Sequence, residues 1–502
     1  MSIFKKLIIP AVVLVLLVGV YFVVTNLPEK EKEDNTGGSS NSETIQIFNF
    51  EKNDLTDIIM ENNNELLHFR YTTIQVEEKT TNEDGTVETK LVDRNVWVPV
   101  EPENINIRSS SVDSIAWNAN SLKAYRIIEE NPSDLSVYGL DDPARITFIL
   151  KDGTKYVLLV GNETPTGGAY YVKKAEEPTV YTISDYEAEK FIQTKFDLME
   201  TAIYDKEYTP DDFAKLKFTR NGSLLFDAVA YPEEYKWMLS YPIEAEARYE
   251  NIYKITESLA GISVVKYIEE NPEDMSKYGL DSPPYVFEYT VGGKDYKLSI
   301  GKLEDNRSNY YAVLNDGNLV FTVSASYFTF LDKPIEEIIS SFVHLQNINE
   351  VSEMVITMDG RVDVSKINVD TEDDEKSTFE FNGVLLTGEK DERYIKKFKE
   401  YYQGAIGVTM DKLNLEAKPV LENPEVTIEY TLKTGEKIRV DLVPESEGVY
   451  FYAFKNGEYT GMMVRRRQLE DESRNGLRVS YPKLVEALKE REEALKAEES
   501  SD

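Results

Sequence analysis

The side chains on which enzymes most often rely are few in this sequence. It contains two histidines, His68 and His344, which lie far apart, and no cysteine. A chain without cysteine has no thiolate nucleophile, no zinc–cysteine site and no disulfide. Neither histidine lies in a zinc-binding or catalytic-triad motif, so we expect both to be structural. The sequence therefore predicts no catalytic residue, no metal site and no cofactor.

Three short patterns resemble functional motifs, but each lacks a required part. Ser299–Lys302 fits a Ser-x-x-Lys pattern, yet the serine ends a predicted strand, and that chemistry needs it at the start of a helix. Asp370–Glu375 lacks the glycine and the final glutamate of an EF-hand loop, which favours a solvated acidic loop over a calcium site. Arg465–Arg467 is basic in an acidic chain, and we expect it to pair with the protein's own acids rather than with an acidic partner.

The abundance of carboxylates leaves one catalytic hypothesis open. Among 91 Asp and Glu residues, a pair with glycosidase-like spacing would be recognised only in three dimensions. The formal net charge of −35 repels nucleic acid, which we do not expect as a partner. The composition is 41% hydrophobic, enough for real cores, and 502 residues are too many for one ordinary core. The sequence therefore predicts several folded domains.

The N-terminus predicts a membrane anchor. Leu7–Val24 is an uncharged run of 18 residues, about 27 Å of helix, which is enough to cross the hydrocarbon core. Lys5 and Lys6 precede it, and the positive-inside rule then places residues 1–6 in the cytoplasm and the bulk of the chain outside. A cleaved signal peptide is the alternative, but the end of the run is bulky and shows no small-x-small site. We expect a single span over residues 7–27 of the cytoplasmic membrane and a flexible stalk over residues 28–43.

A long internal repeat organises the rest of the chain. Ile128–Pro143 and Ile268–Pro283 are identical at 12 of 16 positions, with an offset of 140 residues. The same offset pairs Trp97 with Trp237, and the register persists through Tyr170-Tyr171 and Tyr310-Tyr311. A register kept this long indicates duplicated domains. We predict repeat units over residues 44–204 and 205–345.

A third, degenerate unit is predicted over residues 346–481. Asn423–Tyr430 resembles the strand that follows the repeated segment, and Gly435 supplies a hairpin turn. Phe451–Phe454 matches Tyr310–Val313, but the Tyr-Gly-Leu-Asp element is missing. Residues 482–502 carry a thin apolar stripe among many charges, which predicts a C-terminal helix and tail.

The second copy predicts the architecture of one unit. The spacing of apolar residues in Tyr249–Leu259 is typical of a helix, and Ser324 is placed to cap a short helix. The predicted strands are Trp237–Leu239, Ser263–Ile268, Tyr285–Val291, Tyr296–Ile300, Tyr310–Leu314 and Leu319–Val323. Glycine-containing hairpins join the third strand to the fourth and the fifth to the sixth. The predicted fold class is α+β: an N-terminal transmembrane helix, then two clear repeats and one degenerate repeat of a mostly antiparallel sheet with helices.

The most similar part of the repeat predicts a helix-to-strand corner. An asparagine caps a helix that begins at the next proline, a glycine in the left-handed conformation ends it, and a leucine completes the cap. A second proline then starts an extended segment. The signature positions are Asn131, Pro132, Tyr138, Gly139, Leu140, Asp141 and Pro143, and Asn271, Pro272, Tyr278, Gly279, Leu280, Asp281 and Pro283.

The signature, its hairpin, Gly161 or Gly301, the following Tyr-Tyr-Val or Tyr-Tyr-Ala, and Val180–Ser184 together resemble a bacterial family called domain of unknown function 4340. The resemblance covers roughly residues 70–345, with a fainter third copy to about residue 480. It implies partnership with a gliding-type ABC transport system, that is, with its permease and its ATPase, and an accessory role in export or envelope function. It supplies no catalytic residues.

Three functional hypotheses follow. The first is a non-enzymatic, membrane-anchored extracytoplasmic accessory or binding protein associated with an ABC-type transport system. The second is a cell-envelope module that binds polysaccharide, peptide or cations. An aromatic groove repeated in two units would support it. The third is a carboxylate-based hydrolase. An isolated pair of acidic residues in a deep pocket would support it.

Overall fold

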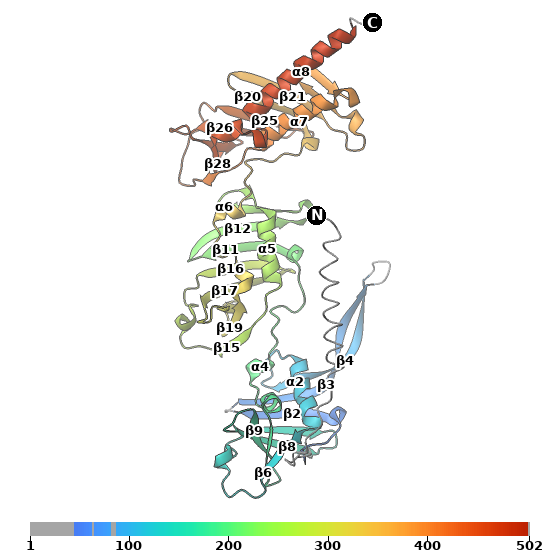
Figure 1. Cartoon of the computed structure of the whole chain (residues 1–502), viewed down its shortest axis with the longest axis vertical. Coiled ribbons are helices and arrows are strands. Elements are labelled where there is room, and N and C mark those ends of the chain that lie inside the picture. Colours follow the sequence, from blue (N-terminus) through green and yellow to red (C-terminus); the bar gives the residue numbers. More distant parts are fainter. Residues whose placement is uncertain (1–44, 63–64, 82–86, 500–502) are drawn as a thin grey trace, which may run out of the picture. The chain divides into compact units, whose positions relative to one another are not determined.

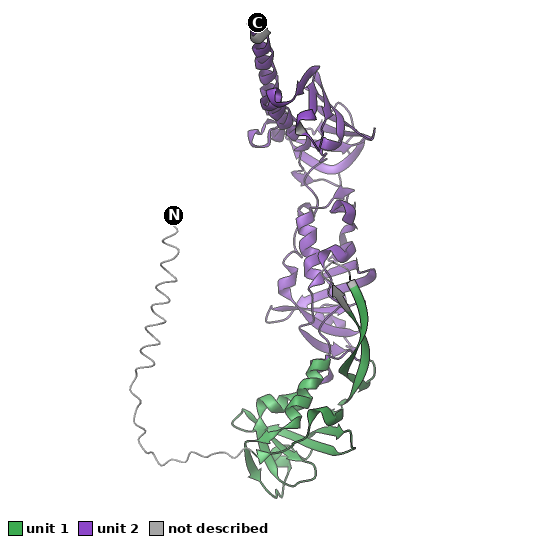
Figure 2. Ribbon diagram, turned by 90° about the vertical axis from the view of Figure 1, so that its right-hand side faces the viewer, with its two compact units in different colours: residues 1–104, 109–193 green, residues 105–108, 194–502 purple. Residues whose placement is uncertain are grey.

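The computed structural model of the chain describes residues 45–62, 65–81 and 87–499 and contains two compact units. Unit 1 comprises Met1–Asn104 and Ser109–Gln193, and unit 2 comprises Ile105–Arg108 and Thr194–Asp502 (Figure 2). The predicted span over residues 7–27 and the predicted stalk over residues 28–43 lie outside the described residues. No helix in the described part of the chain is long and apolar enough to cross a membrane.

Unit 1 contains one eight-stranded antiparallel sheet, which we call the sheet of repeat 1 (Figure 1). Its order is β4-β3-β2-β7-β8-β9-β10-β6. The strands are β2 (Leu55–Asn62), β3 (Glu65–Thr81), β4 (Val87–Glu101), β6 (Arg126–Glu129), β7 (Ala144–Leu150), β8 (Lys155–Glu163), β9 (Ala169–Lys174) and β10 (Val180–Ser184). A small separate pair joins β1 (Ile45–Gln46) to β5 (Lys123–Ala124), and the helices are α2 (Ser109–Asn120) and α3 (Asp185–Phe191).

Unit 2 contains two nine-stranded antiparallel sheets, those of repeats 2 and 3. Repeat 2 has the order β14-β13-β12-β11-β16-β17-β18-β19-β15. Its strands are β11 (Phe213–Arg220), β12 (Ser223–Tyr231), β13 (Lys236–Tyr241), β14 (Ala245–Glu246), β15 (Lys266–Glu270), β16 (Tyr285–Val291), β17 (Lys294–Leu303), β18 (Asn309–Leu314) and β19 (Leu319–Ser324). Its helices are α4 (Lys195–Leu198), α5 (Tyr249–Ala260) and α6 (Ile335–Ile338).

Repeat 3 has the order β23-β22-β21-β20-β25-β26-β27-β28-β24. Its strands are β20 (Val351–Met358), β21 (Arg361–Asn368), β22 (Thr378–Phe381), β23 (Val384–Thr387), β24 (Lys412–Leu413), β25 (Val426–Leu432), β26 (Lys437–Pro444), β27 (Tyr450–Lys455) and β28 (Glu458–Arg465). Its helices are α7 (Glu392–Ile406) and α8 (Leu477–Glu499). The α+β fold of repeated, mostly antiparallel sheets is thus confirmed, and the third copy keeps the complete strand order.

The three sheets share one path of the chain. A hairpin meander forms one side of the sheet, a helix follows, and a short strand lies at the far edge. The chain then returns to the middle of the sheet for a four-stranded meander that ends beside the short strand. This return explains why the longest-range pairings in each repeat lie at the centre, between β2 and β7, β11 and β16, and β20 and β25.

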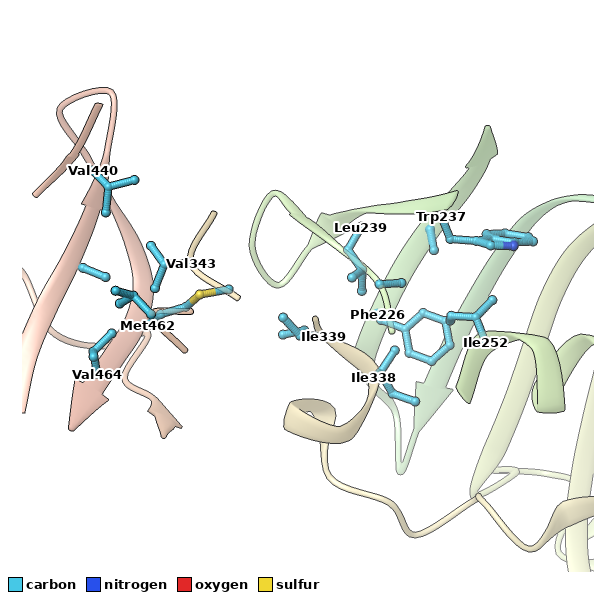
Figure 3. Close-up of a cluster of buried hydrophobic side chains, with 14 of the residues drawn as sticks. Phe226, Trp237, Leu239, Ile252, Ile338, Ile339, Val343, Val440, Met462 and Val464 are labelled. Carbon is cyan, nitrogen blue, oxygen red and sulfur yellow. The ribbon is translucent and has the colours of Figure 1, made fainter. Parts of the chain in front are cut away.

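The helix of repeat 2 shows why the spacing of apolar residues in the sequence was sufficient to predict it. Ile252, Ile255 and Leu259 are spaced three and four residues apart, and all are buried. This spacing places them on one helical face. Ile252 packs near Phe226 on the sheet (Figure 3). The helix predicted over Tyr249–Leu259 is confirmed as α5.

The alternation of buried and less buried side chains explains the strands equally well. β16 has the predicted bounds, and Phe287, Tyr289 and Val291 are buried while the residues between them are less so. Successive side chains in a strand point to opposite faces, so one face of this sheet forms the core. The predicted cap at Ser324 is also present, since its hydroxyl accepts a hydrogen bond from the Ser326 amide.

Several elements differ from the prediction; the strand predicted over Ser263–Ile268, for example, is β15 over Lys266–Glu270. The C-terminal helix α8 begins at Leu477, five residues before the predicted start at residue 482, because Leu477 and Ser480 are buried and dock its first turn. The long hairpin of β3 and β4 was not predicted. It extends far beyond the other strands of its sheet (Figure 1).

Candidate functional site

The signature forms a packing device that we call the clasp: the turns at residues 134–140 and 274–280 with the strand glycines Gly161 and Gly301. Gly139 and Gly279 have φ values of +65° and +68°, the predicted left-handed conformation. Leu140 is buried, and its amide donates to the Leu135 carbonyl at 3.0 Å, as in a Schellman-type helix end.

The predicted helix start is wrong. Asn131 and Asn271 are exposed, and no helix begins at Pro132 or Pro272. Only single 3-10 turns form, Ser136–Tyr138 and Met275–Tyr278. The carboxylates of Asp134 and Asp274 accept hydrogen bonds from the amides two residues later, and these local bonds compete with a longer helix.

The clasp explains why glycine recurs in the neighbouring strand. A Cβ on Gly161 would lie 2.2 Å from the Tyr138 carbonyl oxygen, and a Cβ on Gly301 would lie 2.2 Å from that of Tyr278. The turn therefore rests directly on the backbone of β8 or β17. The Tyr138 hydroxyl donates to Glu129 at 2.7 Å, and Tyr278 makes the same bond with Glu269.

The remaining signature positions show no convergence on a common ligand site. Asp141 and Asp281 are exposed, and Pro143 and Pro283 lead into β7 and β16. The signature thus contributes to the packing of the sheets of repeats 1 and 2.

The histidines lie in different units. His68 Nε2 is 2.7 Å from Asp57 Oδ1, and Arg70 Nε donates to the same oxygen at 3.0 Å. Burial raises the pKa of Asp57, but these hydrogen bonds outweigh burial and hold the pKa below its ordinary value. His344, in unit 2, contacts Gln346 Oε1 at 3.1 Å through Nε2.

The other candidate motifs make contacts within the protein. Arg465 pairs with Asp411 at 3.0 Å, and Arg466 pairs with Glu425 at 2.7 Å, so these two arginines contact the protein's own acids. Ser299 is buried within β17, away from any helix start. Asp370 accepts hydrogen bonds from the amides of Glu372 and Asp373 within its own loop.

The segment from Ile338 to Gln346 joins repeats 2 and 3 within unit 2. The Ser340 amide donates to Glu246 of repeat 2 at 2.8 Å, and the Val343 amide donates to Val408 of repeat 3 at 3.1 Å. Ile338 faces the core of repeat 2, and Val343 lies beside Met462 of repeat 3 (Figure 3). Because one buried hydrophobic cluster continues through this segment, the two repeats hold a defined junction.

A groove of about 690 Å³ lies at this junction, with a smaller cavity of about 310 Å³ beside it. We call the two together the junction groove. The apolar residues that line the larger part of the groove are Leu345, Ile348 and Ile406. Leu345 is 53% exposed. Residues that line both parts are Lys236, Glu246, Leu345, Gln346 and Glu350.

Tyr235 stands at the rim of the groove in an unusual conformation. It has φ +50° and ψ +40°, and the residue is 81% exposed. A left-handed conformation costs a bulky residue roughly 1–2 kcal/mol. The short turn Pro232–Glu234 between β12 and β13 places it there. Sequence analysis missed this residue, although the Pro-Glu-Glu-Tyr turn between two strands was a visible signal.

Charges of both signs line the groove and influence one another. Glu234 pairs with Lys236 and raises its pKa. Partial desolvation and the nearby Lys236 lower the pKa of Lys455. Burial and the charge of Lys455 lower the pKa of His344 to about 4, against the opposing bond to Gln346. Within the described residues, no three histidine or acidic side chains are grouped as a metal site would require.

The fold and groove define an antiparallel α+β repeat protein whose second and third repeats enclose a mixed apolar and charged groove. The family model described as Domain of unknown function (DUF4340) matches residues 97–283 and, in a second overlapping placement, residues 237–434. Together these matches cover more than half of the 502-residue chain, so the protein belongs to this family. Comparisons with curated proteins and with solved structures found no match.

Proposed function

We propose that this protein is a non-enzymatic, membrane-anchored extracytoplasmic accessory subunit whose junction groove binds a polypeptide segment of a membrane partner. The partner class that the family resemblance suggests is an ABC-type transport system, in the first instance its permease. The N-terminal run Leu7–Val24 would hold the protein in the same membrane.

The observation that carries the proposal is Tyr235. A tyrosine is held in a left-handed conformation that favours glycine or asparagine, and it is largely exposed at the rim of a groove. Strained backbone conformations cluster at active sites and ligand-binding sites. Tyrosine is also enriched among the residues that dominate binding energy at protein interfaces.

The chemistry of the groove suits a polypeptide. Leu345, Ile348 and Ile406 can receive an apolar side chain, while Gln346 and Gln403 offer donors and acceptors for a backbone. Lysines and glutamates are interspersed, so the groove does not select a strongly anionic or cationic ligand. A partner segment with one apolar anchor and a hydrogen-bonding backbone fits these features.

Polysaccharide binding has weaker support. Tyr231, Trp237 and Tyr249, together with Tyr235 itself, line a small aromatic pocket in repeat 2. At an offset of 140, Tyr249 corresponds to Ser109 in repeat 1. Strand pairing with the two tryptophans places Thr72 at the position of Tyr231. The aromatic lining is therefore not repeated, contrary to what this hypothesis expects.

The test is copurification of partners with the full-length protein from its native membrane. We expect Tyr235→Ala to reduce recovery of the permease by about tenfold, as expected for loss of an interface anchor worth about 1.4 kcal/mol. Tyr241→Ala is the matched control, because Tyr241 is 43% exposed but does not line the groove. Equal recovery of the permease with both variants, or none with the unaltered protein, would overturn the proposal.

A further inference from the structure

Repeat 1 carries an extension that repeats 2 and 3 lack. In repeat 2 the hairpin of β12 and β13 closes just beyond the pair Tyr231 and Lys236. The equivalent pair in repeat 1 is Thr72 and Val96, but there the strands continue to the pair Thr81 and Val87. We call residues 73–81 and 87–95 the arm (Figure 2).

The arm has two open backbone edges. β2 pairs with β3 only as far as Arg70, so within the described residues the arm strands pair only with each other. β4 is also the outermost strand of its sheet. A two-stranded ribbon is marginally stable by itself, and a long open edge is a template for another strand. These properties indicate that the arm has a strand partner.

The exposed edge of β4 carries charges of both signs around an apolar residue. Leu91 is 65% exposed. Glu88 and Lys90 precede it, and Asp93 and Arg94 follow it. We propose that this edge pairs antiparallel with the same edge of a second copy of the chain, with Leu91 opposite Leu91 on the two-fold axis.

Charge complementarity selects this register. With Leu91 on the axis, Glu88 lies opposite Arg94 of the second copy and Lys90 lies opposite Val92. Residues that face each other in an antiparallel pair interact, and like charges there are destabilising. Shifting the register by two residues in one direction places Lys90 opposite Lys90 of the second copy. Shifting it in the other direction places Lys90 opposite Arg94 of the second copy. Of these three registers, the one centred on Leu91 is the one that avoids both repulsions.

Two-fold symmetry makes the same contacts twice. An isologous dimer uses one patch on both copies, so Glu88 and Arg94 form two equivalent pairs. The two ribbons then form a four-stranded sheet, which satisfies one open edge of each arm. The exposed pairs that Arg94 makes with Glu78 and Glu88 makes with Lys90 are solvent-screened and can exchange at little cost.

The cysteine-free sequence allows a direct test with Leu91→Cys in the full-length, membrane-bound protein. Directly opposed strand residues approach closely enough for a disulfide. Under mild oxidation we expect a disulfide-linked dimer, at a yield on the order of tenfold above that of the control Gln75→Cys. Gln75 is exposed on β3, at the other edge of the arm.

Two further variants test the register. Asp93→Cys lies on the same edge but is displaced from the axis, so it should give little dimer. Glu88→Arg in the Leu91→Cys background should lower the yield, and adding Arg94→Glu should restore it. Equal crosslinking at positions 75, 91 and 93, or no dimer at any of them, would overturn the proposal. So would a thiol-to-amine reagent on Leu91→Cys that joins the chain only to other proteins.

Discussion

Repeats 1 and 2 are most alike at the clasp and least alike at the hairpin that precedes their main helix. The clasp places Gly161 or Gly301 directly beneath a backbone turn, so few side chains fit there. The hairpin has strands of 17 and 15 residues in repeat 1, whose outer parts form the arm, but strands of 9 and 6 residues around Tyr235 in repeat 2. Beyond the core its side chains are exposed, as Leu91 and Tyr235 show. Shared residues thus define the fold, while the differing hairpins carry the two proposed binding surfaces.

Repeat 3 sharpens this contrast because it keeps the sheet without the clasp. Strand pairing places Val443 at the position of Gly301, and the segment 414–425 contains no 3-10 turn. The turn and the glycine are therefore absent together. Repeat 3 instead holds α8, whose Arg491 bonds both oxygens of the buried Asp391 at 2.7 and 2.9 Å.

The largest expected effect comes from filling the clasp. Gly301→Ala places a Cβ 2.2 Å from the Tyr278 carbonyl oxygen, so the turn must move off β17. We expect the free energy of unfolding of unit 2 to fall by about 3 kcal/mol. Urea unfolding of the full-length protein with Trp97 and Trp117 replaced by Phe, so that tryptophan fluorescence reports Trp237 in unit 2, measures this change.

Gly261→Ala is the matched control, since its Cβ would meet only ordinary contacts at 3.5 and 3.7 Å. We expect it to change the free energy of unfolding by less than about 1 kcal/mol. Similar stabilities of the two variants would show that close backbone packing does not explain the shared glycines.

A smaller effect is expected at the junction, which only unit 2 contains. The folded protein lowers the pKa of His344 to about 4, whereas an unfolded histidine titrates near 6.5. Between these values the unfolded chain binds a proton that the folded chain does not bind. The His344 contribution to stability is therefore complete above about pH 6.5 and falls by about 2 kcal/mol as the pH drops to 4.5.

The difference between the unaltered protein and His344→Gln isolates this contribution from the many carboxylates. We expect the stability of the unaltered protein to fall relative to that of His344→Gln as the pH falls from 7 to 4.5 in urea unfolding series. Parallel pH profiles would contradict a desolvated, neutral histidine at the junction.

The sequence predicted those parts of the fold that depend on local patterns. Apolar spacing located α5, alternation located β16, and the offset of 140 located the repeated sheets. The helix expected at Asn131 failed because Asp134 bonds a nearby amide and shortens it to one turn. The junction groove could not be predicted, because Tyr235, Leu345 and Ile406 come from three distant segments that only the packing of repeats 2 and 3 brings together.

The most direct test of the binding function places a photoreactive amino acid at position 235 of the full-length protein in its native membrane. Tyr235 is exposed at the rim, so a bound partner segment must lie within reach of the probe. We predict that irradiation joins the chain to an ABC-type permease, and that the same probe at position 241 does not. Crosslinks from position 241 but not from position 235, or from neither, would contradict a partner bound in the junction groove.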